Sequence, residues 1–194
     1  MRPSKKVALT GGMGAGKSLC SAILREMGFE VISADELSRE VTRKGSPGLR
    51  AVISAFGAEF LTPEGELDRR RLAGKVFSDP AALQKLNELT HPLIREELCR
   101  RMAEREGVVF AEVPLLAESG MAGLFDAVWT VEAPERIRAA RAAERDGTDE
   151  EAAMARIRRQ AGEAERRAVA DLVLKNDGTP EDLRARITEA LKTL

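Results

Sequence analysis

The sequence predicts an α/β fold in which helices flank a five-stranded parallel sheet, with a long helical insertion and a second helical segment added to it. Short apolar runs recur along the 194 residues without the polar alternation of half-exposed strands, which indicates strands covered on both faces. Helical stretches separate these runs, as connections between parallel strands require. A glycine-rich turn that ends in lysine and serine joins the first run to the first helix.

The predicted strands are short and lie near the beginning and in the second half of the chain. They are residues 6–10, 30–33, 108–113 and 127–131, with a weaker candidate at 172–174. Between the first two, Ile23, Leu24 and Met27 are spaced for one buried face, which predicts a helix over residues 19–27.

The glycine-rich turn is residues 11–18, which fit the phosphate-binding pattern Gly-x-x-x-x-Gly-Lys-Ser. A chain that turns here from strand to helix directs successive backbone N–H groups into one concavity, where a polyphosphate binds. We expect Lys17 to reach the β and γ phosphates of a nucleotide and the Ser18 hydroxyl to bind Mg²⁺. The alternative is a glycine-rich turn that binds nothing.

About seventy residues between the second and third strands have helical character. Breaks are predicted at residues 45–48, at 62–65 and at His91-Pro92, and a helix is expected to begin at Asp79-Pro80. A plain crossover needs only about a dozen residues. We therefore interpret residues 35–105 as a substrate-binding subdomain.

Residues 135–165 are rich in Ala, Arg and Glu and poor in large apolar side chains, with a turn at residues 147–149. They are interpreted either as a solvated helical hairpin or as a mobile lid, since little buried apolar surface gives the low local stability that a lid requires. The remaining segments, about 1–34, 106–134 and 166–194, form the predicted nucleotide-binding core of a single domain.

Composition excludes several classes of protein. The 31 basic and 32 acidic residues nearly cancel, so the chain has no overall positive field for nucleic acid. No apolar run approaches the ~20 residues of a membrane span, and the first six residues leave no room for a signal peptide. Cys20 and Cys99 lack metal-ligand spacing and are expected to be buried, reduced thiols, as in a cytoplasmic protein.

Asp35 follows the second strand, and in an open parallel sheet the ligand crevice lies outside the carboxyl ends of the strands. A carboxylate there can accept a proton from an attacking hydroxyl or hold a Mg²⁺-bound water. Asp is also a good N-cap, so capping of the following helix is an equal alternative.

Arg141 and Arg145 lie four residues apart on one face of the predicted lid, and no acidic residue on that side is at pairing distance. Their guanidinium groups suit the charge that develops on a transferred phosphoryl group. The alternative is a pair of surface salt bridges, such as one between Arg141 and Glu144.

Three further features carry less information. Glu112 ends the third strand and is a weak candidate for a metal-binding acid, and a lone histidine such as His91 is more often a packing residue than a catalyst. The guanine-reading pattern Asn-Lys-x-Asp is absent, since residues 175–177 are only superficially similar to it.

Several segments recur in a familiar order. They are residues 10–18, 34–35, 86–94 and 113–118, Arg141 with Arg145-Asp146, residues 156–160, and residues 170–171 with 176–178. With these segments the chain resembles the dephospho-CoA kinase family from about residue 6 to 180. Many families share the phosphate loop, whereas the His91-Pro92 segment combined with Pro-Leu-Leu-Ala-Glu at 114–118 is far more specific.

The resemblance implies a P-loop kinase that transfers the γ-phosphate of ATP to the ribose 3′-hydroxyl of dephospho-CoA, the last step of coenzyme A synthesis. It implies Asp35 as the general base, acting with Lys17, Arg141 and Arg145. The residues implied to bind ATP are Gly12, Met13, Gly14, Ala15, Gly16, Lys17, Ser18, Leu19 and Asn176. The implied substrate-side residues are Asp35, His91, Pro114, Leu115, Leu116 and Glu118.

We expect ATP and dephospho-CoA as substrates, with Mg²⁺ bound by Ser18 and by Asp35 through water. We expect no nucleic-acid or membrane partner, and a monomer or weak homo-oligomer. Ser33 stands where the family often has Asp, and Leu19 where it often has Thr. The alternatives are another small-molecule or nucleoside monophosphate kinase and a nucleotide-dependent switch. A switch typically uses a glutamine to orient water, but Gln84 and Gln160 lie in helical regions.

Overall fold

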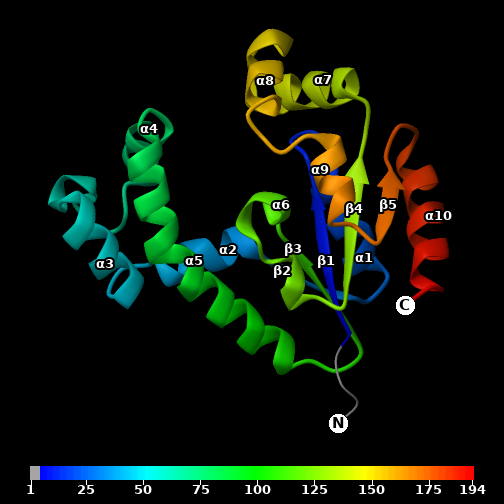
Figure 1. Ribbon diagram of the computed structural model, residues 1–194, viewed down its shortest axis with the longest axis horizontal. Helices are drawn as coiled ribbons and strands as arrows, with labels where there is room; N and C mark the ends of the chain where they lie inside the picture. The colour runs from blue at the N-terminus through cyan, green and yellow to red at the C-terminus, as the bar shows by residue number, and fades with distance from the viewer. Residues whose placement is uncertain (1–4) are drawn as a thin grey trace. The chain divides into compact units, whose positions relative to one another are not determined.

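The computed structural model describes residues 5–194 and contains one sheet of parallel strands in the order β2-β3-β1-β4-β5 (Figure 1). The strands are β1 (Lys5–Gly11), β2 (Glu30–Ser33), β3 (Val108–Glu112), β4 (Ala127–Glu132) and β5 (Leu172–Lys175). Each end lies within one residue of its predicted position, so the predicted α/β fold is confirmed. Because β1 lies between β3 and β4, the strand order reverses at β1, where parallel sheets bind ligands.

Helices connect the strands. They are α1 (Lys17–Glu26), α2 (Ala34–Val41), α3 (Pro47–Phe56), α4 (Arg69–Phe77), α5 (Pro80–Ala103), α6 (Leu116–Ser119), α7 (Glu135–Asp146), α8 (Glu150–Ile157), α9 (Glu163–Ala168) and α10 (Pro180–Leu191), with 3₁₀ turns η1 (Ala58–Phe60) and η2 (Ala122–Leu124). Side-chain caps fix several starts: Ser46 accepts from the Leu49 amide before α3, and Asp149 from the Ala152 amide before α8.

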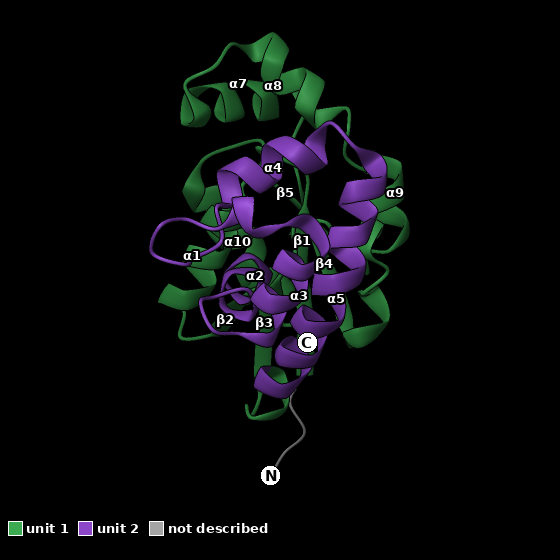
Figure 2. Cartoon of the chain, turned by 90° about the vertical axis from the view of Figure 1, so that its left-hand side faces the viewer, with its two compact units in different colours: residues 1–33, 102–194 green, residues 34–101 purple. Residues whose placement is uncertain are grey.

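The chain divides into two compact units, coloured separately in Figure 2. Of the described residues, the first comprises 5–33 and 102–194, and so contains the sheet together with α7 and α8, the predicted lid. The second comprises residues 34–101 and is entirely helical apart from its loops and one isolated bridge between Leu61 and Leu67.

The core of the first unit lies between the sheet and the helices α1 and α10. Val7 and Leu9 of β1 are fully buried there, against Leu24 of α1 and Ile187 of α10. Two aromatic side chains complete it, with the Phe110 and Trp129 ring centroids 5.2 Å apart in an edge-on arrangement. Cys20 of α1 belongs to this core and is fully buried.

The second unit has an apolar core of its own, drawn from α3, η1, α4 and the beginning of α5. Its buried members are Leu49, Val52, Phe60, Leu67, Leu72, Val76 and Ala82. The members of this cluster come from segments as far apart in the sequence as Leu49 and Ala82, so the insertion has a contiguous core of its own.

The break predicted at His91-Pro92 is wrong, because α5 continues through Pro92 as one helix of 24 residues. Proline removes one N–H from the helix and crowds the preceding turn. The loss is tolerated here because the helix continues into the buried residues Ile94 and Leu98, whose packing stabilises its second half.

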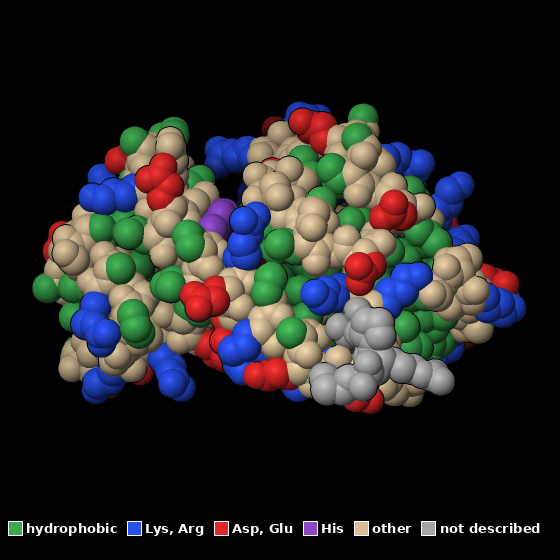
Figure 3. Space-filling view, turned by 60° about the horizontal axis from the view of Figure 1, so that its bottom comes forward, with side chains coloured by type: hydrophobic (Ala, Val, Ile, Leu, Met, Phe, Trp, Pro, Cys, Tyr) green, Lys and Arg blue, Asp and Glu red, His purple; other side chains and the backbone are tan. Residues whose placement is uncertain are grey.

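Basic and acidic side chains are interspersed on the face drawn in Figure 3, in keeping with the formal net charge of −1. Among residues 5–194 no helix is both long and apolar enough to cross a bilayer. The two cysteines are free, with Cys20 buried and Cys99 partly exposed, so the prediction that both are buried is wrong for Cys99.

Candidate active site

The phosphate loop follows β1 directly and leads into α1. Gly11, Gly14 and Gly16 adopt positive φ values of 146°, 73° and 99°. A Cβ on Gly11 would lie 2.4 Å from the Val131 carbonyl oxygen, and one on Gly16 would lie 2.0 Å from Nδ2 of Asn176. Glycine is therefore required at both positions by backbone conformation and by close neighbours.

Lys17 and Ser18 lie in the first turn of α1, at the positive end of the helix dipole. The Lys17 Nζ donates to the carbonyl oxygens of Gly11 (2.7 Å) and Gly12 (3.1 Å), so the ammonium group lies across the loop. Ser18 is exposed at the surface. Both side chains are thus at the loop, as the motif predicts.

Three side chains from distant segments hold the backbone of the loop. Asn176, which is 2 % exposed, donates from Nδ2 to the Ala15 carbonyl at 2.7 Å. Oε1 of Gln160 accepts from the Met13 amide at 2.8 Å, and Nε of Arg138 donates to the Met13 carbonyl at 2.9 Å. The resemblance gave Asn176 as a nucleotide-binding residue, whereas here its amide supports the loop.

Arg138 was missed in the sequence because nothing distinguishes it from the other arginines of its segment. Gln160 carried one signal, since it ends the segment 156–160 that contributes to the family resemblance.

Arg141 and Arg145 both lie in α7 but have different partners. Nη1 of Arg141 donates to the Asn176 carbonyl at 3.0 Å, beside the phosphate loop. Arg145 forms a two-pronged ion pair with Asp146, with N–O distances of 2.7 and 3.0 Å, and Arg156 binds the same carboxylate at 2.6 Å. These hydrogen bonds from Arg145 and then Arg156 lower the pKa of Asp146 to about 2.

The prediction that the two lid arginines have no acidic partner is therefore wrong for Arg145. Asp146 is the last residue of α7. At the end of the helix its carboxylate can reach the guanidinium of the preceding residue, Arg145.

The carboxyl end of β3 bears Glu112, whose Oε2 accepts a hydrogen bond from the Ser21 hydroxyl of α1 at 2.7 Å. Burial, and secondarily the charge of Glu112, raises the pKa of the nearby Cys20 thiol to about 12. An acidic group thus stands one strand away from the phosphate loop, in register with Leu9 of β1.

The segment 114–118 is divided between surface and core. Leu115 is 48 % exposed, and Oε1 of Glu118 accepts from the Ala161 amide at 2.9 Å, which ties this segment to the loop between α8 and α9. Leu116 is fully buried, so its expected contact with substrate is not supported.

A buried ion pair joins β4 to α9. Both oxygens of Glu132 accept from Arg166, at 2.7 Å from Nε and 2.6 Å from Nη2, and both side chains are 4 % exposed. Thr130 adds a hydrogen bond to the same carboxylate at 2.8 Å. With its hydrogen-bonding capacity met in this way, the pair anchors α9 on the end of β4.

In the second unit, Asp35 lies in the first turn of α2, two residues after the end of β2. The helix already begins at Ala34, and within residues 5–194 the exposed Asp35 carboxylate caps no backbone amide. Capping therefore does not account for this residue. Its position at the end of a strand next to β3 is the one the sequence predicted.

His91 is half-buried on α5 of the same unit. Burial lowers the pKa of its imidazole, and the positive charge of Arg95 lowers it further. Both effects favour the neutral form of the imidazole, in which one ring nitrogen donates a hydrogen bond and the other accepts one.

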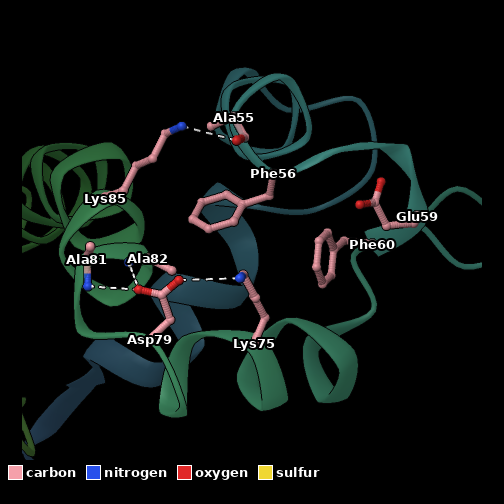
Figure 4. Close-up of a pocket in the computed structure, with 9 residues that line it drawn as sticks. All are labelled: Ala55, Phe56, Glu59, Phe60, Lys75, Asp79, Ala81, Ala82 and Lys85. Carbon is pink, nitrogen blue, oxygen red and sulfur yellow. Dashed lines mark hydrogen bonds and ion pairs between the residues drawn. The ribbon is translucent and has the colours of Figure 1, made fainter.

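The second unit also contains an open pocket of about 560 Å³ between α3, η1, α4 and α5 (Figure 4). Phe56 and Phe60 line it, and its cations are engaged: Lys75 pairs with Asp79 at 3.3 Å, and Lys85 donates to the Ala55 carbonyl at 3.1 Å. Its residues match none of the predicted site positions.

No group of three or more His, Cys, Asp or Glu side chains among the described residues could hold a metal ion by itself. A metal at this site would therefore depend on the phosphates of the nucleotide and on the Ser18 hydroxyl. That donor set is typical of Mg²⁺, which keeps several waters and few protein ligands.

Comparison with known proteins agrees with this geometry. The sequence model of the dephospho-CoA kinase family matches residues 5–182. A dephospho-CoA kinase of Frankia casuarinae is 45 % identical over 190 residues, which cover 97 % of this chain and 82 % of that protein.

Two solved structures share the fold over almost their whole length. The crystal structure of TT1252 from Thermus thermophilus superposes with a TM-score of 0.84 at 35 % identity, covering 100 % of this chain and 99 % of that one. Dephospho-CoA kinase from Campylobacter jejuni gives a TM-score of 0.73 at 28 % identity, covering 97 % and 96 %. With its family model matched over most of its length and a relative this similar, the chain belongs to the dephospho-CoA kinase family.

Proposed function

We propose that this protein transfers the γ-phosphate of ATP to the ribose 3′-hydroxyl of dephospho-CoA, giving coenzyme A and ADP. Membership of the family supports the substrates. The observation that carries the chemistry is the phosphate loop at the switch point of the sheet, with Lys17 across it and Arg141 beside it. This arrangement suits phosphoryl transfer, which depends on positioning and on stabilising charge.

On the nucleotide side, residues 12–19 would bind the phosphates of ATP through backbone N–H groups and the Lys17 ammonium. Arg141 and Arg145 would stabilise the charge that develops on the equatorial oxygens. Arg145 would have to exchange its partner Asp146 for phosphate, whereas Arg141 is already held beside the loop by the Asn176 carbonyl.

Mg²⁺ would be bound by the Ser18 hydroxyl together with the phosphates, where it would neutralise their charge. Glu112, at the end of β3, is a further acidic group for its hydration shell. Ser33, which pairs in register with Glu112, would contribute a hydroxyl where an aspartate is frequent.

Asp35 would take the proton from the 3′-hydroxyl of the acceptor. Its carboxylate is exposed and caps no helix, so proton transfer requires no structural bond to break. His91 of the second unit and Pro114, Leu115 and Glu118 of the first would bind the rest of the acceptor, whereas Leu116 has no accessible side chain.

We propose that the protein works on small molecules alone, as a monomer or weak homo-oligomer in the cytoplasm, where ATP is produced. Its mixed surface charge supports the absence of a nucleic-acid partner.

A coupled assay for ADP tests the proposal. With Mg²⁺ and ATP, we expect rapid ADP release only when dephospho-CoA is added, and a product heavier by one phosphate at the 3′ position. Equal turnover with AMP or a nucleoside would instead indicate a different nucleotide kinase. Slow ADP release that ignores every acceptor would indicate a switch protein.

A further inference from the structure

One residue of the phosphate loop is held from both sides by the lid. The Met13 amide donates to Oε1 of Gln160, and the Met13 carbonyl accepts from Nε of Arg138. Arg138 lies in the first turns of α7 and Gln160 three residues after the end of α8, so the two contacts come from the two ends of one hairpin.

The Met13 side chain adds an apolar contact to these two hydrogen bonds. It packs on Ala142, Ala143 and Ala153, the small core between α7 and α8. Small alanines leave room for the long, flexible methionine, which fills irregular gaps well. Every chemical group of Met13 is therefore engaged by the hairpin.

Arg138 is also wedged beneath the loop. It is 2 % exposed, and a Cβ on Gly12 would lie 2.1 Å from its Nη2. The Nη2 atom is buried and has no hydrogen-bond partner among the described residues. A buried guanidinium with an unsatisfied donor is costly, which argues that this residue is retained for a role other than stability.

The buried guanidinium is closed off from solvent, so it cannot itself contact a phosphate that binds on the open side of the loop. Its effect must pass through the backbone. The two hydrogen bonds restrain the peptide units on either side of the Met13 Cα atom, which limits the φ and ψ angles of Met13 and orients the residues that follow. Those residues carry the N–H groups that face the phosphates.

We propose that Arg138 and Gln160 are positioning residues for ATP: by holding Met13 they keep the phosphate loop in its binding shape and join that shape to the lid hairpin. This proposal rests on the proposed function, since it concerns the loop that would bind ATP. It assigns a role to two residues outside the motif itself.

The chemistry of the side chains supplies a conservative variant. Nε2 of glutamine is the same number of bonds from Cα as Nε of arginine. Arg138→Gln therefore retains the donor to Met13 and removes the charge, whereas Arg138→Met retains most of the volume and removes the donor. For Gln160, Gln160→Leu removes the acceptor at similar size.

The test is calorimetric binding of a non-hydrolysable ATP analogue with Mg²⁺, together with KM for each substrate. We expect Arg138→Met and Gln160→Leu each to weaken nucleotide binding about 10-fold, the size of one lost hydrogen bond. KM for dephospho-CoA should change by less than about 2-fold, because the proposed acceptor-binding residues lie outside the phosphate loop. Arg138→Gln should restore most of the affinity.

A double variant tests whether both residues act through Met13. If they do, Arg138→Met combined with Gln160→Leu should weaken binding by less than the product of the single effects. The matched controls are Arg136→Met, an exposed arginine on the same helix, and Gln84→Leu, an exposed glutamine in the second unit; both should bind as the wild type does.

Three results would overturn the proposal: nucleotide affinity within about 2-fold of wild type in both single variants, equal losses for both substrates with a lowered melting temperature, or no rescue by Arg138→Gln. If Arg138→Met does not fold, Gln160→Leu and Arg138→Gln still decide. Failure of the wild type to phosphorylate dephospho-CoA would refute the proposed function alone, because the binding measurement needs no acceptor.

Discussion

The nucleotide side and the acceptor side of the proposed reaction are built on opposite principles. In the first unit, the phosphate loop is held by Arg138, Gln160 and Asn176, and even Lys17 is bonded to loop carbonyls. In the second unit, Asp35 is exposed in the first turn of α2, and its carboxylate caps no backbone amide of the described residues.

The difference follows from what each group must do. Backbone N–H groups have no mobility of their own, so a loop that binds phosphate gains from being fixed in advance. A general base must approach and release a proton, so an exposed carboxylate without structural obligations is suitable. Substitutions on the acceptor side should therefore lower kcat without lowering the melting temperature. Substitutions on the nucleotide side should also weaken ATP binding.

The strongest test of the acceptor side is Asp35→Asn. The change keeps size but removes the proton acceptor, so we expect kcat to fall on the order of 10²- to 10⁴-fold. ATP binding and the melting temperature should stay almost unchanged because Asp35 bonds to no other described group.

Added Mg²⁺ distinguishes the two roles open to Asp35, since it should partly rescue a lost contact to metal-bound water but not a lost base. If a folded Asp35→Asn enzyme turned over dephospho-CoA within a few-fold of wild type, Asp35 would not be the general base, and the contrast drawn between the two sides would be wrong.

On the nucleotide side, Lys17→Ala should lower kcat at least about 100-fold, since a transition-state charge contact is typically worth ~3 kcal/mol. The fold should persist, because Lys17 lies across the loop and not in the core. Steady-state kinetics and circular dichroism check both parts. Near-normal kcat in the folded variant would refute the assignment of the phosphate site.

Hydrogen exchange compares the lid with the second unit. The α7–α8 core consists of alanines around Met13, whereas the second unit packs Leu, Val and Phe side chains together. We therefore expect residues 135–165 to exchange faster than α3 in the free protein, and to slow when both substrates bind. Unchanged exchange in this segment with both ligands present would favour a solvated hairpin without a lid function.

The smallest effect concerns His91, the one histidine of the sequence. Burial lowers the pKa of its imidazole in the folded protein, so the unfolded chain binds the proton more tightly. Its contribution to stability is thus present above pH about 6.5 and is lost as the pH falls through the lower, folded pKa.

Urea midpoints at pH values on either side of this transition check the effect. The wild type should lose more stability on acidification than His91→Gln does. Equal losses in the two proteins would show that the lowered pKa of His91 does not contribute to the pH dependence of stability.

The sequence predicts local features well and tertiary ones poorly. The strands and the phosphate loop were predicted because apolar runs and a contiguous octet carry their own signals. The contact of Arg138 with the loop and the buried Glu132–Arg166 pair depend on which segments meet in space, and an arginine-rich stretch does not say which arginine lies inside.

Two errors have the same origin. The resemblance implied Leu116 as a substrate-side residue together with its exposed neighbour Leu115, and the five residues 114–118 are too few to show by periodicity which positions face inward. The break at Pro92 was expected from local chemistry, but the packing of a long helix overrode it. Roles assigned from the family resemblance to Asp35 and His91 remain predictions that the experiments above decide.

Cys20 has a consequence for chemical probes of this protein. Its thiol lies only two residues beyond Ser18, yet burial holds its pKa at about 12, so almost no thiolate exists at neutral pH. Alkylating reagents and mild oxidants should therefore spare it and react at the partly exposed Cys99 of α5. A covalent inhibitor aimed at the phosphate loop would find no reactive thiolate there, while a dye on Cys99 would report from the second unit.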